Sequence, residues 1–80
     1  MISDLNREKL KIGKKEVLSA IASGEAAMVF LAADCDESIS APIEAAAKHA
    51  QIPVETAESR KALGKACGID VGASCAAKLR

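Results

Sequence analysis

The sequence predicts one α/β domain in which a β-sheet carries helices on both of its faces. The chain has 80 residues, which is near the lower size limit for a core that holds without metal or disulfide. Helical and strand-like patterns alternate along its whole length, and such alternation favours a sheet between layers of helices. Residues 26–33 form an unbroken apolar run, which is typical of a strand covered on both faces. We therefore treat residues 1–80 as a single domain.

The first part of the chain contains two helical patterns with a short apolar segment between them. Ser3 is placed to cap a short helix from Asp4 to about Leu10. Lys11–Ile12 lies before the next helical pattern and is expected to add an edge strand. The second helix begins at Lys14 and ends at Gly24, and its apolar positions follow helical spacing: Val17, Leu18 and Ile21.

The middle of the chain is expected to form a central strand, a helix and a shorter strand. Residues 34–38 are polar and end the apolar run, and Ser40 is expected to cap the helix that follows. The inward stripe of that helix is expected to contain Ile43, Ala46, Ala47 and Ala50. Residues 52–54 predict a short strand, which Pro53 places near an edge of the sheet.

The last part of the chain predicts a helix, a loop and a final strand. Ser59 is expected to cap the helix and Gly68 to end it. Residues 69–73 then form a loop, and residues 74–79 form the strand. Helices therefore alternate with strands throughout the chain.

Charge is distributed very unevenly along the chain, although the formal net charge is zero. Residues 1–15 carry five basic and two acidic groups, residues 16–58 one basic and eight acidic, and residues 59–80 five basic and one acidic. If the two ends of the chain meet in the fold, one face is basic and another acidic. Such a surface orients an approaching polyanion, and the acidic side is open to a protein partner.

The start of the second helix is the stretch most suggestive of a binding site. Gly13 allows a sharp turn, and the unpaired N–H groups of the turn that follows favour an anion. Lys14 and Lys15 oppose the helix dipole there, which suggests that they serve a ligand such as a phosphate backbone. The alternative is that they are ordinary exposed lysines at a helix start.

The loop at residues 69–73 is the second such stretch. Ile69 and Val71 beside the flexible Gly72 would form an apolar shelf that could receive an RNA base. RNA-binding proteins commonly stack bases on aromatic side chains, but the only aromatic residue here is Phe30, in the expected buried strand. Contact with a base would therefore have to be aliphatic. The alternative is that both side chains turn inward and plug the sheet.

These residues carry a resemblance to a known family. Gly13-Lys14-Lys15-Glu16, then residues 31–34, then the segment from Leu63 to Ala73 are similar in order to the ribosomal protein L7Ae/L30e family, and most of all to its short bacterial members that bind kink-turn RNA. The resemblance implies a three-layer α-β-α sandwich with a mixed sheet of about four strands. It also implies structured RNA, including ribosomal RNA, as the partner.

The resemblance implies roles for particular residues. The helix start would enter the major groove beside sheared G·A pairs, with Lys15 and Glu16 at guanine edges, Gly13 allowing the close approach and Lys14 near the phosphates. A lysine donor suits guanine O6 and N7. The loop would pack on a flipped-out base through Ile69, Val71 and Ala73, with Gly72 between them, and Arg60 would lie near the bend in the RNA.

One position departs from the family pattern. Ser19 stands where members usually carry a lysine, one helical turn after Lys15. The absence of this lysine removes a charge-assisted hydrogen bond that is worth about 1–3 kcal/mol. Weak kink-turn binding, a different RNA or a different partner would each follow from this departure.

The residue pattern gives little support to an enzyme, a metal centre or a cofactor. The cysteines, Cys35, Cys67 and Cys75, are odd in number and have no paired spacing, which argues against a disulfide framework and fits a reducing cytoplasm. Together with His49 they lack the short-spaced ligand pair of a zinc site. Asp34 and Asp36 are expected to cap or order a loop.

Two hypotheses remain. The first is a non-catalytic, cytoplasmic RNA-binding protein with no membrane segment, since the longest apolar run is far shorter than the ~20 residues that span a bilayer. The second is a protein-interaction module of the same fold that binds kink-turn RNA weakly or not at all.

Overall fold

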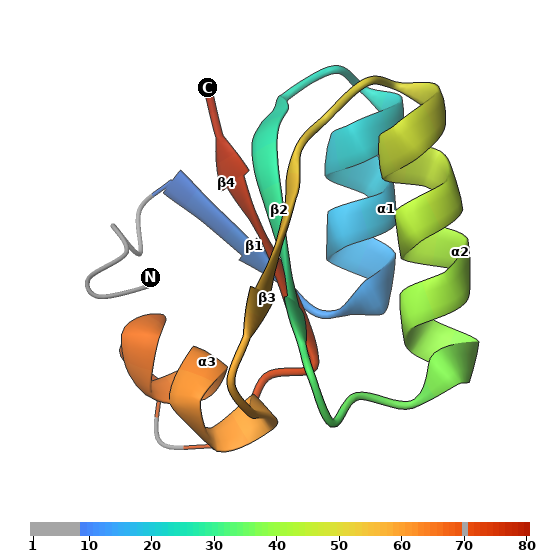
Figure 1. Ribbon diagram of the computed structural model, residues 1–80. Coiled ribbons are helices and arrows are strands. Elements are labelled where there is room, and N and C mark those ends of the chain that lie inside the picture. The colour runs from blue at the N-terminus through green and yellow to red at the C-terminus, as the bar shows by residue number, and fades with distance from the viewer. Residues whose placement is uncertain (1–8, 70) are drawn as a thin grey trace.

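The computed structural model describes residues 9–69 and 71–80, which form a four-stranded mixed sheet with helices on both faces (Figure 1). Its elements are β1 (Leu10–Ile12), α1 (Lys14–Ala22), β2 (Ala26–Ala32), α2 (Glu37–His49), β3 (Val54–Ala57), α3 (Arg60–Ala66) and β4 (Cys75–Leu79). The strand order is β1-β4-β2-β3, with only the β2–β3 pair parallel. α1 and α2 cover one face and α3 the other. The predicted three-layer sandwich is confirmed.

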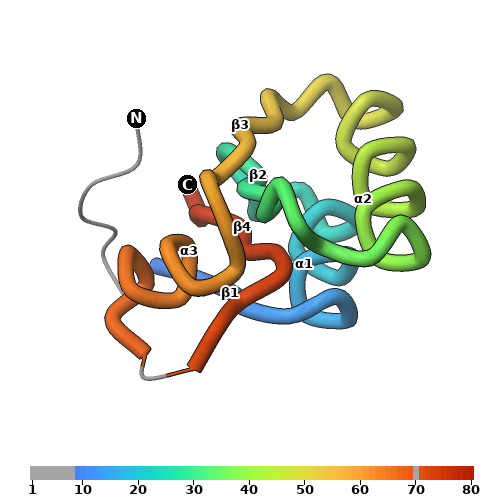
Figure 2. The backbone as a smooth tube through the Cα atoms, turned by 60° about the horizontal axis from the view of Figure 1, so that its bottom comes forward, coloured from blue at the N-terminus to red at the C-terminus, as the bar shows by residue number. Residues whose placement is uncertain are grey.

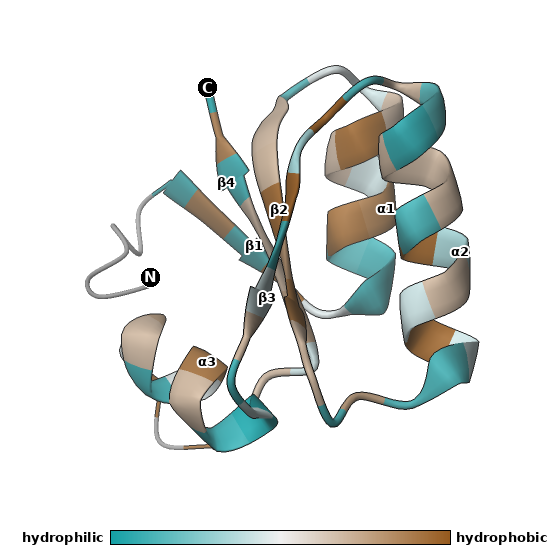
Figure 3. Cartoon of the chain, in the orientation of Figure 1, coloured by the Kyte–Doolittle hydropathy of each residue, from teal (hydrophilic) through white to brown (hydrophobic). Residues whose placement is uncertain are grey.

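The apolar run at β2 is the central strand that its composition predicts. It lies between β4 and β3, and its side chains alternate between two cores. Val29 and Leu31 belong to the core under α1 and α2, whereas Phe30 and Ala32 belong to the core under α3. In Figure 3 the brown of this strand continues through the middle of the molecule, with teal on the outer sides of the helices. Burial on both faces explains the absence of polar alternation.

The N-terminal prediction is corrected at its end. Most of the expected helix over residues 4–10 lies outside the described residues, but Leu10 is in β1 and pairs with Lys78 of β4. The predicted strand at Lys11–Ile12 is confirmed, and it lies at the edge of the sheet. This pairing brings the two ends of the described chain together, because β1 and β4 are neighbours.

The start of α2 was predicted at the wrong residue. Asp36, and not Ser40, is the N-cap: its Oδ1 accepts a hydrogen bond from the backbone N–H of Ser38 at 3.2 Å. Aspartate and serine cap helices about equally well, so the sequence offered two starts four residues apart. The prediction that Ala50 belongs to the inward stripe is also wrong, because α2 ends at His49 and Ala50 is an exposed cap residue.

β3 begins two residues later than predicted. Pro53 has no N–H to donate to a ladder, and it contributes only its carbonyl, which accepts from the N–H of Val29 at 3.0 Å. The strand itself runs over Val54–Ala57, at the edge of the sheet as expected. The cap of α3 is as predicted, with Ser59 Oγ accepting from the N–H of Ala62 at 3.0 Å.

None of the helices in the described part of the chain has the length and apolar character needed to cross a membrane.

Candidate nucleic-acid interface

Gly13 forms the turn between β1 and α1, and it does so with a backbone geometry that essentially only glycine adopts. Its φ is 105° and its ψ is 154°, in the region closed to residues with a Cβ. The N–H of Gly13 donates to the carbonyl of Cys75 at 3.2 Å, so the turn is fixed to the start of β4. Space around the missing Cβ is open, which leaves the turn accessible from outside.

The first turn of α1 is cationic and exposed. Lys14, Lys15 and Glu16 are all exposed, while Val17 is fully buried and fixes the helix on the sheet. No side chain caps this helix, so its first N–H groups point toward solvent and favour an anion. Ser19 is exposed as well. The whole outward surface of the helix start is therefore available to a ligand.

Glu16 has a partner that sequence reasoning missed. The Nζ of Lys11 lies 3.9 Å from Glu16 Oε1, and both side chains are about half exposed. An exposed pair of this kind contributes little to stability, and it places the Glu16 carboxylate beside Lys11 of β1. The pairing depends on the Gly13 turn, since Lys11 is on the strand before it and Glu16 is on the helix after it.

The loop that follows α3 presents one apolar side chain to solvent. Val71 is 70% exposed, whereas Ala73 is buried in the core under α3 and Ile69 is partly buried against it. Of the three residues expected to form a shelf, Ile69 and Ala73 therefore point inward, and Val71 alone is exposed. Both alternatives offered by the sequence are realised, each by a different residue.

Close backbone packing holds this loop against α3. A Cβ on Gly64 would overlap the carbonyl oxygen of Val71, and one on Gly72 would lie 3.3 Å from the Cβ of Arg60. The N–H of Ala73 donates to the carbonyl of Arg60 at 3.0 Å. The position of Val71 is thus determined by glycine at residue 64 and by the first turn of α3.

Arg60 is held in turn by Asp34. The Oδ1 of Asp34 accepts from the backbone N–H of Arg60 at 2.7 Å and lies 3.7 Å from its Nε. The expected loop-ordering role of Asp34 is confirmed, but its partner was not foreseen. The only sign of this contact in the sequence is the position of the Asp34 carboxylate just after the buried strand.

These segments lie together at one end of the strands, where β1, β2 and β3 end and β4 begins, and this end is called the edge below. In Figure 2, which brings that edge forward, the turn into α1 and the segment leading into β4 lie side by side. Hydrogen bonds connect Gly13 to Cys75, Ala73 to Arg60, and Arg60 to Asp34. The edge therefore carries the cationic helix start, the Arg60 side chain and the exposed Val71.

The thiols and the histidine do not form a reactive group. Cys75 and Cys67 belong to cores on opposite faces of the sheet, and burial raises the pKa of both thiols, that of Cys75 to about 11 with a smaller contribution from Cys35. His49 is exposed at the end of α2. The described residues contain no cluster of three metal-ligating side chains.

The fold and the site together define a class of protein. Its members are small α-β-α sandwiches with a mixed four-stranded sheet, in which a helix that begins with glycine and lysines lies at one end of the strands. The ribosomal protein L7Ae/L30e/S12e/Gadd45 family matches residues 3–80, and the chain belongs to that family. The resemblance drawn from the sequence is confirmed.

Relatives in sequence and in structure agree with this assignment. RNA-binding protein GK0100 of Geobacillus kaustophilus and RNA-binding protein YbxF of Geobacillus stearothermophilus are each 45% identical over 76 residues, covering 95% of this chain and 93% of theirs. The solved structure of the Giardia lamblia 15.5kD RNA binding protein has a TM-score of 0.85 at 30% identity and covers 91% of this chain. This chain spans 62% of the Giardia protein. A protein from Bacillus halodurans, at 23% identity and a TM-score of 0.85, shares the fold.

Proposed function

We propose that this protein is a non-catalytic RNA-binding protein that recognises a bent, kink-turn-like internal loop. The observation that carries the proposal is the hydrogen bond from Gly13 to Cys75, which joins the cationic helix start to the strand that follows the Val71 loop. One bent RNA can contact both segments at once. Membership of the family and the names of the bacterial relatives support RNA as the partner.

The helix start supplies the groove contacts in this proposal. Lys15 donates to O6 and N7 of a guanine, a pattern that lysine reads well in a major groove. The unpaired N–H groups of the first turn and Lys14 meet the phosphates. Glu16, which lies beside Lys11, accepts hydrogen bonds from exposed base edges.

The loop and α3 supply the contacts on the other side of the bend. Val71, at 70% exposure, lies against an unstacked base, because protein recognition of RNA commonly covers the face of such a base and burying apolar surface is favourable. Arg60 pairs with a phosphate near the bend. Asp34 fixes the backbone from which that arginine extends.

The setting that we propose is a structured RNA in the cytoplasm, such as ribosomal RNA. The pairing of β1 with β4 brings the basic segments over residues 9–15 and 75–80 together, whereas acidic residues of the middle block such as Glu44 lie on α2. Such polarity orients the protein on a large polyanion. The acidic side remains free for a protein partner while RNA is bound.

The proposal is tested by titrating a kink-turn RNA and the same RNA with its G·A pairs replaced. We expect tighter binding to the first by at least about 10-fold, since each lost bidentate contact costs about 1–3 kcal/mol. Equal, weak binding to both would overturn it. The slope of affinity against salt counts the phosphates contacted.

Replacing Lys15 with alanine is expected to weaken kink-turn binding by about 10-fold or more, because a guanine contact is lost. The melting temperature should change little, since the side chain is exposed. Calorimetry and a fluorescence titration measure the two quantities. Lys48→Ala, an exposed lysine near the end of α2, is the matched control and should leave binding unchanged. A large fall in the melting temperature of Lys15→Ala would show that the residue is structural.

Replacing Ser19 with lysine is expected to strengthen kink-turn binding by about 10-fold, because it restores a charge-assisted contact one turn after Lys15. Ala22→Lys adds the same charge at the exposed far end of α1 and should raise affinity much less. Equal gains would point to charge alone. Undetectable binding in Ser19→Lys would favour the protein-interaction hypothesis.

A further inference from the structure

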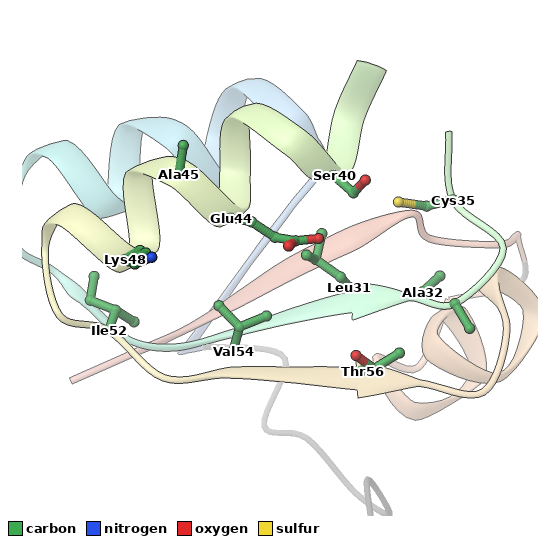
Figure 4. A pocket seen from close by; sticks show the side chains of 11 residues that line it. Leu31, Ala32, Cys35, Ser40, Glu44, Ala45, Lys48, Ile52, Val54 and Thr56 are labelled. Carbon is green, nitrogen blue, oxygen red and sulfur yellow. The ribbon is translucent and has the colours of Figure 1, made fainter. Parts of the chain in front are cut away.

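A groove of about 800 Å³ runs between α2 and β3, on the side edge of the sheet (Figure 4). Its floor is apolar, made by Leu31, Ile52 and Val54, and its rim carries the polar side chains of Ser40, Glu44, Lys48 and Thr56. The residues of the proposed RNA-binding edge are not among its lining. The groove is therefore a separate surface.

β3 presents an open hydrogen-bonding edge beside this groove. The carbonyls of Pro53 and Ala57 accept from Val29 and Ala33 of the β2 segment, so alternate residues of β3 turn their backbone groups toward β2. Val54 and Thr56 must then turn theirs away. In the part of the chain that the structure describes, β3 pairs with β2 alone.

The same two residues also line the groove. The side chain of Val54 belongs to its floor and that of Thr56 to its rim, and Val54 is 40% exposed. A chain added along β3 would thus form main-chain hydrogen bonds at the positions where its own alternate side chains enter the groove. This combination of ladder and pocket is the geometry of strand addition.

Charge selects the kind of side chain that enters. In Figure 4 the carboxylate of Glu44 extends from α2 over the apolar floor, and Lys48 lies one turn further on, toward Ile52. Asp36 and Glu37 add carboxylates at the start of α2, near Ser40. A long side chain with an apolar stem and a cationic end fits this floor and this carboxylate, and Lys48 disfavours a second cation beside it.

We propose that an extended segment of a protein partner adds to the edge of β3 and places one arginine in this groove. Its main chain pairs with Val54 and Thr56, the stem of the arginine lies along Leu31 and Val54, and its guanidinium meets the carboxylate of Glu44. Arginine suits the position because its planar fork pairs with a carboxylate through two hydrogen bonds. The proposal is independent of the RNA-binding edge.

The test is an NMR titration of the ¹⁵N-labelled full chain with the blocked peptide acetyl-Thr-Val-Arg-Val-Thr-amide. We expect shifts at residues 54–57 and around Glu44. The peptide with glutamate in place of arginine should bind about 10-fold more weakly. A peptide N-methylated at the arginine and at the second threonine should also lose binding, because in an antiparallel ladder the residues whose side chains enter the groove are the ones whose N–H groups turn toward β3. No shifts at about 5 mM peptide, equal binding of the arginine and glutamate peptides, or shifts centred on the start of α1 would overturn the proposal.

Variants of the groove complete the test. Glu44→Gln should lower affinity for the arginine peptide about 10-fold and remove its preference over the glutamate peptide. Glu58→Gln removes an exposed carboxylate outside the groove lining and should change neither. Adding kink-turn RNA should leave the peptide bound. If the RNA itself shifts residues 54–57 and displaces the peptide, the groove is an RNA surface and the proposal fails.

Discussion

Gly64→Ala is expected to lower the melting temperature by at least about 12 °C. The added Cβ overlaps the carbonyl oxygen of Val71, a backbone atom that cannot move without displacing the whole loop. Overpacking of this kind costs about 3 kcal/mol, and each kcal/mol corresponds to about 4–8 °C in a domain of this size. Calorimetry measures the change.

The sign of this prediction separates packing from helix propensity. At an open helical site, alanine in place of glycine stabilises by about 1 kcal/mol. Ala66→Gly, in the same helix and only half buried, is the matched control and should cost about that amount. A Gly64→Ala protein that is as stable as the wild type would mean that the loop moves away from α3 without cost.

Gly13→Ala is expected to reduce kink-turn affinity by at least about 10-fold and to cost about 1–3 kcal/mol of stability. Space for the methyl group is open, so the whole effect comes from the backbone angles, φ 105° and ψ 154°. Relief of that strain would rotate the turn, break the hydrogen bond to Cys75 and tilt the first N–H groups of α1. RNA titration and thermal unfolding measure the two effects.

Gly24→Ala is the control for this variant. Gly24 has a φ of 78° and also has open space around it, but it follows the opposite end of α1. Alanine there should cost about 1–2 kcal/mol of stability and leave RNA affinity unchanged. If both variants lose affinity equally, the loss reflects general destabilisation and not the geometry of the turn.

Sequence reasoning succeeded where one interaction dominates a local choice. The apolar run at β2 could be satisfied only in the middle of the sheet, and Ser59 had no competing cap nearby, so both predictions are confirmed. It failed where two local solutions were nearly equal in energy. Asp36 and Ser40 are both good caps, and the choice of Asp36 follows from where the turn after β2 leaves the chain.

Some residues of the candidate site could be predicted from the sequence and others could not, for the same reason. Gly13 and the two lysines after it could be recognised as an exposed helix start, because helical spacing places Val17 inward and leaves the lysines outside. The opposite orientations of Val71 and Ile69 could not be predicted, since loop side chains have no periodicity. Asp34 and Arg60, 26 residues apart, meet only after β2 and β3 have paired.

The sequence by itself determined the types of most elements, the burial of β2 and the cationic character of the first turn of α1, because each follows from residues close together in the chain. Only the tertiary structure decided that β4 lies between β1 and β2, and hence that Cys75 meets Gly13 at the same edge as Arg60 and Val71. The order of strands depends on non-local hydrogen bonds between backbones that are chemically alike. The local sequence pattern of a strand therefore does not indicate which other strand it will pair with.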